Sequence, residues 1–539
     1  MEKAFQMGKT SATGSFQLLI GVATSIIIMA VGTVFLTRFL GKDNYGLYTL
    51  SMAPSLMINL FRDWGVSSAI TKHIASLRAE GKEPETCDIL LAGVTFQVAT
   101  GVAMSSLSFV LAGLFASILK RPDIYPYISI MSITILSGSL LTAAQSSFIG
   151  YERMNLNSLT IICQAIVKTA VGPVLVLLGY GILGAVFGYT LSYIAAGLIG
   201  VTILYFVLYK PLTKSRKARS SISKTLKPML RYGIPLSISS ILLGLLTQFN
   251  TLLMGVYIPN TTTGNSLIGN YGAAINFAVL LAFFTTPIAT VLFPAFAKLD
   301  SQNEGELVKT VFASSIKYTA ILLIPATMAV MALSTPIVNM LFGQQYAYAP
   351  FFLTLYVIGN LYAVVGNLSL GSLLTGLGET KVLMKQAVLT IIIGLPLAFL
   401  LIPPLGVLGV IIGGLLSGIP SMVWGLHWVW KHYEAKAEFR SSAKIFIAST
   451  LAAITSFLVI SFLHTHASIQ LILGLAVFLT VYILGAPIIG AVTQSDIDAL
   501  RNMFSSLGIV SKIINIPLKA AEKAAHTKSA KKKQPEKST

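Results

Sequence analysis

The chain has 539 residues, of which 55% are hydrophobic and only 11% are charged, and its formal net charge is +19. These values exclude an ordinary soluble protein of two or three domains. Apolar runs of roughly 20 residues, long enough for a helix to cross a ~30 Å hydrocarbon layer, recur along the whole chain. The composition therefore predicts an all-α polytopic membrane protein.

Fourteen apolar segments are expected to span the membrane. The first has Lys3 and Lys9 before it, but it is too long for a signal-peptide core and lacks a small-residue cleavage site, so we expect it to be retained. In chain order the expected spans are 15-38, 46-68, 88-118, 125-149, 156-178, 183-209, 233-257, 271-296, 311-342, 350-374, 384-402, 406-429, 445-463 and 471-491.

The sequence also contains an internal duplication. Asn44-Tyr45-Gly46 recurs 226 residues later as Asn270-Tyr271-Gly272, and Gly150 maps onto Gly376 at the same offset. A glycine ladder repeats at an offset of 225, from Gly181, Gly184 and Gly188 to Gly406, Gly409 and Gly413. One nearly constant offset over three motifs indicates two repeats of about 225 residues.

Each repeat holds six spans, and six is even, so both copies enter the membrane in the same orientation. Such parallel repeats are related by an axis along the membrane normal, with a site near the midplane between them. The ladders favour close helix packing rather than chemistry. The expected organisation is an N-terminal six-helix lobe at 1-210, a basic linker at 211-231, a C-terminal six-helix lobe at 232-430, accessory helices at 431-492 and an interfacial helix with a basic tail at 493-539.

The basic residues predict the orientation of the spans. With a cytoplasmic N-terminus, 31 of the 38 Lys and Arg residues fall in inside segments, so both ends are expected in the cytoplasm. The net charge is then a topology signal and needs no nucleic acid as partner. The 210-231 loop and Lys531-Lys532-Lys533 are expected near anionic lipid headgroups. Apolar residues at helical spacing make 497-512 either an interfacial helix or a solvated extension.

Charged residues within the spans are the candidate binding residues, because each costs ~2.5–3.5 kcal/mol to insert. Lys168 lies at the centre of the fifth span with Gln164 one turn before it on the same face. Arg62 and Asp63 lie in the inner half of the second span, where neighbouring side chains point about 100° apart and need partners on other helices. The alternative is structural, with Asp63 pairing with Lys168 or Arg62.

Other polar residues are weaker candidates for a cavity. Arg38 and Lys317 lie near span ends, where snorkelling also accounts for them. Asn360 and Asn367 are seven apart and are expected on one helix face. The remaining embedded amides, some of which will be helix-to-helix hydrogen bonds, are Gln145, Gln248, Asn250 and Asn276. The embedded set carries more cations than acids, so a cavity lined by it would bind an anion.

No cofactor, metal site or catalytic residue is expected. Cys87 and Cys163 are too few and too far apart for a metal site, and His464 and His466 are expected to be structural residues of an outer loop. The chain has no GxxxxGK[ST] phosphate-binding loop. A membrane enzyme would need converging carboxylates, a metal or a sizeable extramembrane domain. A non-transporting scaffold is disfavoured by the embedded charges.

The chain resembles polysaccharide and oligosaccharide-lipid flippases of the Wzx (RfbX) type, within the multidrug/oligosaccharidyl-lipid/polysaccharide exporter superfamily. The resemblance covers roughly residues 10 to 430. The stretches that carry it are Phe39 to Tyr48, Asp63-Trp64-Gly65 with Ala69, Gly269 to Ala274, Phe293-Pro294-Ala295, Leu341-Phe342-Gly343 with Tyr346, and Gly376-Leu377-Gly378.

This resemblance implies two six-helix lobes around a central cavity, working by alternating access. It implies a polyprenyl- or dolichyl-(pyro)phosphate-linked glycan as cargo, carried from the inner to the outer leaflet of the plasma membrane. Membrane lipids and glycan-assembly enzymes are the partners it suggests, and a monomer is expected. The alternative is a MATE-type exporter of organic cations or drugs, which would want acids in its cavity where this chain offers only Asp63.

Overall fold

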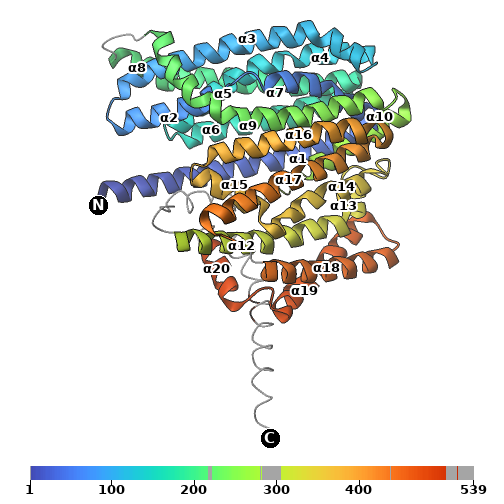
Figure 1. Ribbon diagram of the computed structural model, residues 1–539. Coiled ribbons are helices and arrows are strands. Elements are labelled where there is room, and N and C mark those ends of the chain that lie inside the picture. The colour runs from blue at the N-terminus through green and yellow to red at the C-terminus, as the bar shows by residue number, and fades with distance from the viewer. Residues whose placement is uncertain are drawn as a thin grey trace. The chain divides into compact units, whose positions relative to one another are not determined.

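In the computed structural model, the described residues are 2–215, 221–278, 281, 305–436, 439–504, 519 and 522. Nearly all of them are helical and none of them lies in a strand (Figure 1), which confirms the all-α prediction. The chain divides into two compact units. Unit 1 comprises Met1–Asn276 and Ala387–Ser417, and unit 2 comprises Phe277–Gln386 and Gly418–Thr539. The predicted lobes 1-210 and 232-430 remain a prediction.

Unit 1 contains the whole first repeat and the first helices of the second. Its elements are α1 (Glu2–Asn59), α2 (Val66–Ala79), η1 (Glu83–Glu85), α3 (Thr86–Ile118), η2 (Pro122–Ile124), α4 (Tyr125–Met131), α5 (Ile133–Gly150), α6 (Met154–Leu175), η3 (Val176–Tyr180), α7 (Gly181–Ile203), η4 (Leu204–Tyr209), α8 (Lys210–Ser215), α9 (Ile222–Tyr257), most of α10 (Thr262–Ala278), and parts of α16 (Thr380–Leu405) and α17 (Val407–Tyr433).

Unit 2 contains the rest of the second repeat and the C-terminal helices. Its elements are α12 (Gly305–Ala332), α13 (Ser334–Leu341), α14 (Ala349–Val357), η6 (Ile358–Val365), α15 (Asn367–Gly376), α18 (Phe439–Phe462), α19 (Ala467–Ile489) and α20 (Gln494–Phe504). Its core lies where α12, α18 and α19 pack together, around Ala320, Ile324, Ala448 and Phe478.

Ten helices of the described residues are long and apolar enough to cross a membrane, and a bent pair makes an eleventh. This number is lower than the fourteen expected spans for reasons that lie at particular residues. The first and second spans join at the kink of Gly41, and the fifth and sixth join through Gly179. The eighth expected span continues past α10 into residues outside the described ranges. The count of fourteen therefore remains a prediction.

The glycine ladders pack helices closely, as expected. Gly179 and Gly181, both with positive φ, allow α7 to fold back on α6. A Cβ at Gly188 would overlap the backbone of Gly172 on α6, and one at Gly184 would meet Leu175. In the second repeat, Gly409 lies in the same way against Leu401 of α16. The ladders thus serve the fold.

Two predicted spans are interrupted, which corrects the sequence analysis. The second span was expected to be one helix over 46-68, but α1 ends at Asn59 and α2 begins only at Val66. Trp64 and Gly65 have positive φ in this break, so the helix cannot continue. The tenth span bends by 59° at Gly366, which separates η6 from α15. Hydropathy averages over such breaks and does not detect them.

The two copies of the duplicated triplet pack against each other inside unit 1. A Cβ at Gly46 would overlap the carbonyl oxygen of Asn265, and a Cβ at Gly269 would overlap that of Lys42. Nearby, Asn276 donates a hydrogen bond to the Tyr45 hydroxyl at 2.9 Å. The backbones of α1 and α10 approach this closely because both contact positions are glycine.

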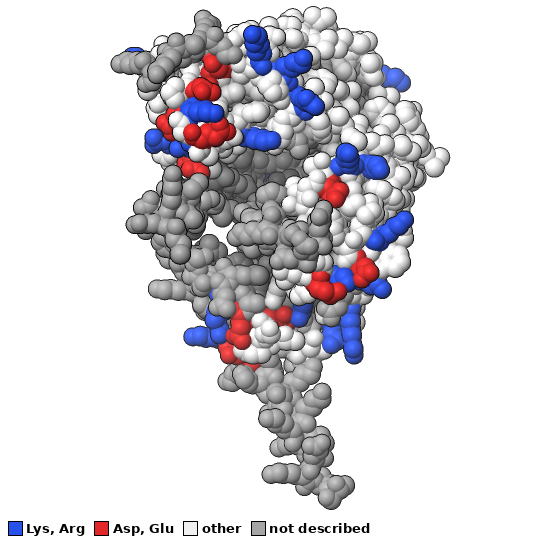
Figure 2. All heavy atoms as spheres, turned by 60° about the vertical axis from the view of Figure 1, so that its left-hand side comes forward, with Lys and Arg blue, Asp and Glu red and all other residues white. Residues whose placement is uncertain are grey.

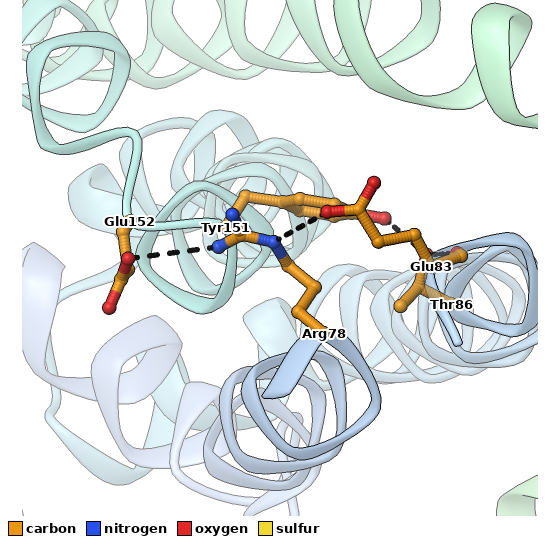
Figure 3. A network of polar contacts seen from close by, with 5 residues as sticks. All are labelled: Arg78, Glu83, Thr86, Tyr151 and Glu152. Atoms are coloured by element: carbon orange, nitrogen blue, oxygen red, sulfur yellow. Dashed lines mark hydrogen bonds and ion pairs between the residues drawn. The ribbon is translucent and has the colours of Figure 1, made fainter. Parts of the chain in front are cut away.

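A polar network joins α2, η1 and the turn between α5 and α6 (Figure 3). Arg78 lies 3.3 Å from Glu83 and 3.9 Å from Glu152. The Tyr151 hydroxyl and the Thr86 hydroxyl are hydrogen-bonded. Burial raises the pKa of Tyr151 to about 12, and the hydrogen bond to Thr86 opposes that shift. Charged side chains of both signs also gather on the face of the molecule seen in Figure 2.

The glycine contact predicts a steric effect. Gly269→Ala should lower the stability of the protein by about 1–3 kcal/mol, because the added methyl group would overlap backbone. Apparent melting temperature in detergent is the measurement. Gly371→Ala on α15 is the matched control, since nothing lies within 4 Å of a Cβ there. Equal melting temperatures for the two variants would contradict the close contact.

The raised pKa of Tyr151 predicts a pH effect. Its pKa in the folded protein lies above the ordinary value of 10.0, so its stabilising contribution is complete below pH 10.0 and is lost as pH rises toward 12. Tyr151→Phe should cost about 1 kcal/mol at neutral pH, and this deficit should shrink over that alkaline window. Melting temperatures of both proteins at each pH test this. A pH-independent deficit would contradict it, and the exposed Tyr125 provides a control as Tyr125→Phe.

Candidate functional site

Asp63 lies in the break between α1 and α2, not within a helix as expected. Its carboxylate accepts hydrogen bonds from the Ser67 amide at 3.1 Å and the Ser67 hydroxyl at 2.7 Å. A third hydrogen bond comes from the side-chain amide of Gln97, a fully buried residue of α3. An acceptor at this position stabilises the first turn of α2. Asp63 therefore fixes how α2 leaves the break.

Arg62 reaches from the same break to α5. Its guanidinium donates to the Thr142 hydroxyl at 2.9 Å and to the Ile135 carbonyl at 3.5 Å, while its Nε is buried without a hydrogen-bond partner among the described residues. Its Nη1 lies over Gly138, the position where α5 has no side chain. Both acceptors are neutral, and the adjacent Asp63 is occupied by Ser67 and Gln97. The charge of Arg62 is thus held in place without being neutralised by direct contact.

Lys168 projects from α6 toward α7. Its Nζ lies 5.1 Å from the centroid of the Tyr189 ring, which is in turn 5.2 Å from that of Tyr193. Tyr193 also lies against Gly138, beside the guanidinium of Arg62. The two tyrosines are four residues apart, so they lie on one face of α7. Arg62, Lys168, Tyr189 and Tyr193 form what we call the cation–tyrosine cluster.

The ion pair of Lys168 with Asp63, which the structural alternative requires, is not found among the described residues. Among the described residues no carboxylate lies within 4.0 Å of its Nζ, and Asp63 is bound elsewhere. A ring face attracts a cation by ~0.5–2 kcal/mol, less than a buried ion pair would. The cluster thus presents two cations on one side of unit 1 with one nearby acid, which is an arrangement that can bind an anion.

The other predicted residues of unit 1 are scattered. Gln145 donates to the Thr160 hydroxyl at 3.3 Å, which is a hydrogen bond between α5 and α6. Gln164 lies half-buried on α6, and Gln248 is half-buried on α9. On α9, Asn250 has a buried side-chain oxygen that accepts no hydrogen bond within the described part of the chain. Asn276 binds Tyr45, as described above. Arg38 is exposed on α1.

In unit 2, Lys317 forms a buried ion pair. Its Nζ lies 2.8 Å from Oδ2 of Asp496, which is only 4% exposed, and Asp496 also accepts from the Thr493 amide and hydroxyl. The pair fastens the start of α20 to α12. The interfacial helix expected at 497-512 begins as α20, and its part from 505 onward lies outside the described residues.

The pair Asn360 and Asn367 needs a correction. Asn360 lies in η6 and Asn367 opens α15, with the bend at Gly366 between them. They are therefore not on one helix face. Asn367 is exposed and Asn360 is half-buried.

Sequence reasoning missed several residues around the cluster. Gln97 is an embedded amide like those selected, and Tyr189 and Tyr193 have the i, i+4 spacing of a shared helix face. Tyr45 and Tyr48 are buried on α1, with ring centroids 5.9 Å apart. Tyrosines are common within apolar spans, so the sequence alone does not single out Tyr189 and Tyr193. Their position next to a cation does, and it is visible only in the structure.

Comparison with known proteins identifies the family to which the chain belongs. The family described as polysaccharide biosynthesis protein matches residues 11–300, more than half of the chain. The chain belongs to the polysaccharide biosynthesis protein family. This confirms the resemblance drawn from the motifs.

Two relatives illustrate the similarity. The chain is 26% identical over 415 residues to lipopolysaccharide biosynthesis protein WzxC of Escherichia coli strain K12, covering 74% of the chain and 75% of the relative. It is 22% identical over 473 residues to the probable low-salt glycan biosynthesis flippase Agl15 of Haloferax volcanii, covering 87% of the chain and 94% of the relative.

Two solved structures share the fold. Lipid II flippase MurJ in an inward closed conformation matches with a TM-score of 0.69 at 17% identity, over 87% of the chain and 98% of MurJ. An inward-facing multidrug resistance MATE family transporter matches with a TM-score of 0.62 at 15% identity, over 76% of the chain and 94% of the transporter. The chain therefore shares its fold with these two membrane transporters.

The Lys317–Asp496 pair yields a testable difference. Lys317→Met leaves a buried carboxylate without its cation and should cost about 3–5 kcal/mol. Lys309→Met on the same helix is the matched control, since its contacts with Glu306 and Glu434 are exposed and worth about 0–1 kcal/mol. The readout is unfolding in mild detergent. Equal stability of the two variants would show that the buried pair contributes little.

Proposed function

We propose that the protein carries a polyprenyl- or dolichyl-(pyro)phosphate-linked oligosaccharide from the inner to the outer leaflet by alternating access. The chain's family and its flippase relatives support the cargo class, and the transporter fold supports the mode of movement. The protein is proposed to be a transporter and not an enzyme. Its place is proposed to be the plasma membrane, with both termini in the cytoplasm.

The cation–tyrosine cluster is the observation that carries this proposal. Lys168 has an aromatic neighbour and, among the described residues, no carboxylate in contact, and Arg62 is held by neutral oxygens. A cation kept in this way retains its attraction for an anionic headgroup. Bare phosphate in hydrocarbon is prohibitive, so the headgroup needs such a cationic, hydrated surface while its lipid tail stays in the bilayer.

The cargo's charge also suggests the driving force. Two negative charges that move outward across a negative-inside membrane gain ~4.6 kcal/mol per 100 mV. The membrane potential can therefore drive the step without ATP. The remaining predicted cavity residues of unit 1, Gln145, Gln164, Gln248, Asn250 and Asn276, are proposed as polar neighbours of the glycan portion.

The alternative is a cation or drug exporter, which the MATE fold match keeps in view. Such a transporter needs an acid that is free to bind its cargo or a coupling ion. Asp63 is engaged by Ser67 and Gln97, which argues against that role. The proposed partners are the lipid-linked glycan, membrane lipids and glycan-assembly enzymes, and the proposed oligomeric state is a monomer.

The test is translocation of a labelled polyprenyl-diphosphate sugar in proteoliposomes. Lys168→Gln and Arg62→Gln each remove one charge-assisted contact, worth about 1.5–3 kcal/mol, so each should slow flipping roughly ten- to hundred-fold. Lys224→Gln, at an exposed lysine near the start of α9, is the control and should flip normally.

Two results would contradict this proposal. One is equal flipping by all three variants at matched reconstitution. The other is a wild-type protein that ignores the glycan lipid but moves an organic cation in an Asp63-dependent way, which would establish the drug-exporter alternative.

A further inference from the structure

Arg121 is the largest fully buried side chain of the described residues, with 1% of its surface exposed. It lies in the short connection between α3 and η2, which belongs to the first repeat. A buried arginine usually has a carboxylate partner. None lies within 4.0 Å of this one among the described residues, so its partners need an explanation.

The partners are neutral oxygens, and most of them come from the second repeat. Nη2 donates to the Ile258 carbonyl at 3.0 Å, the Pro259 carbonyl at 3.4 Å and Oδ1 of Asn265 at 3.3 Å. Nε also donates to Asn265, at 3.4 Å. Nη1 donates to the Gly255 carbonyl and to the Leu119 carbonyl at 3.2 Å. The guanidinium is thus enclosed by the end of α9, the connection that follows it and the first turn of α10.

That connection is shaped to receive it. The Asn265 side-chain amide donates to Oδ1 of Asn260 at 3.1 Å, which turns the Asn265 oxygen toward Arg121. The Gly264 amide donates to the Thr261 hydroxyl at 3.1 Å, and the Asn265 amide donates to the Thr261 carbonyl at 2.8 Å. The connection from Ile258 to Thr261 and the first turn of α10 are therefore braced by their own hydrogen bonds where they meet Arg121.

We propose that Arg121 is a latch that holds the two repeats together at the outer end and that has to release when the protein opens outward. This end is the outer one in the proposed orientation, which places both termini in the cytoplasm. Beneath it, Gly46 and Gly269 bring α1 and α10 into backbone contact. The two repeats cannot separate at this end while Arg121 keeps its four partners on the second repeat.

The chemistry suits a contact that is made and broken. Each hydrogen bond to a charged group is worth about 1.5–3 kcal/mol, but carbonyl oxygens and a guanidinium are both well solvated by water once the end opens. A carboxylate partner would hold far more tightly in a dry environment. Neutral acceptors therefore hold the repeats together in the closed state and still allow them to separate.

The test measures access from outside in intact cells with a membrane-impermeant maleimide. The reporter is Ala273→Cys, a fully buried position of α10, in a background with Cys87 and Cys163 replaced by alanine. Arg121→Gln and Asn265→Ala should each raise labelling severalfold. Lys120→Gln, an exposed neighbour with the same loss of charge, should leave it unchanged.

A second reporter separates opening from general loosening. Ala92→Cys is equally buried but lies near the start of α3, at the opposite end of that helix from Arg121, and should stay unlabelled. Unchanged labelling of Ala273→Cys in folded Arg121→Gln would overturn the latch, as would equal rises at both reporters. If Arg121→Gln fails to fold, Asn265→Ala decides, because it removes one acceptor only. Failure of both to fold would make the contact purely structural and would also overturn it.

The inference rests on the proposed transport function for the reason to open, and on the proposed orientation for the side from which labelling is measured. Labelling is measured without any glycan lipid, so the two proposals fail separately. A latch that releases in a protein that moves no glycan lipid overturns the cargo assignment alone. Flipping without a change in labelling overturns the latch alone.

Discussion

A chain that crosses hydrocarbon has to satisfy its own backbone groups, and this requirement governs the break at residues 60–65. The helix ends gradually, with the amides of Leu60, Phe61 and Arg62 turning to carbonyls three residues back. Asp63 then supplies acceptors for the first turn of α2. This one interruption sets the direction of α2. It also places Arg62 against α5 and Asp63 against the buried Gln97 of α3.

Three cations illustrate three ways of holding a charge away from water. Lys317 has a buried carboxylate, which makes it a fixed part of the fold. Arg121 has, among the described residues, only carbonyl and amide oxygens as partners, which satisfy its donors without cancelling its charge. Lys168 has an aromatic face, the weakest of these environments. The more strongly a cation is bound by its surroundings, the less it can interact with another charged group, so Lys317 is the least free of the three and Lys168 the most free.

Sequence reasoning succeeded where a property is local. Long apolar runs located α3, α18 and α19 to within a few residues, and the repeated glycines identified helix contacts. It failed where a property depends on distant partners. Lys317 and Asp496 are 179 residues apart, and nothing in the sequence connects them. Lys168 could be selected for its depth, but whether it meets Asp63 or Tyr189 depends on how α6 and α7 are rotated, which hydropathy does not encode.

The meeting of the two duplicated triplets bears on how such a chain arises. In an ancestor made of two identical copies, the segment around Gly46 would have packed against its own counterpart, so that any mutation changed both sides of the interface together. Two copies within one chain are free of that constraint. The first can carry Arg121 and the second the Asn265 segment that accepts its hydrogen bonds, and this contact is then made once, whereas a symmetric dimer would make it twice.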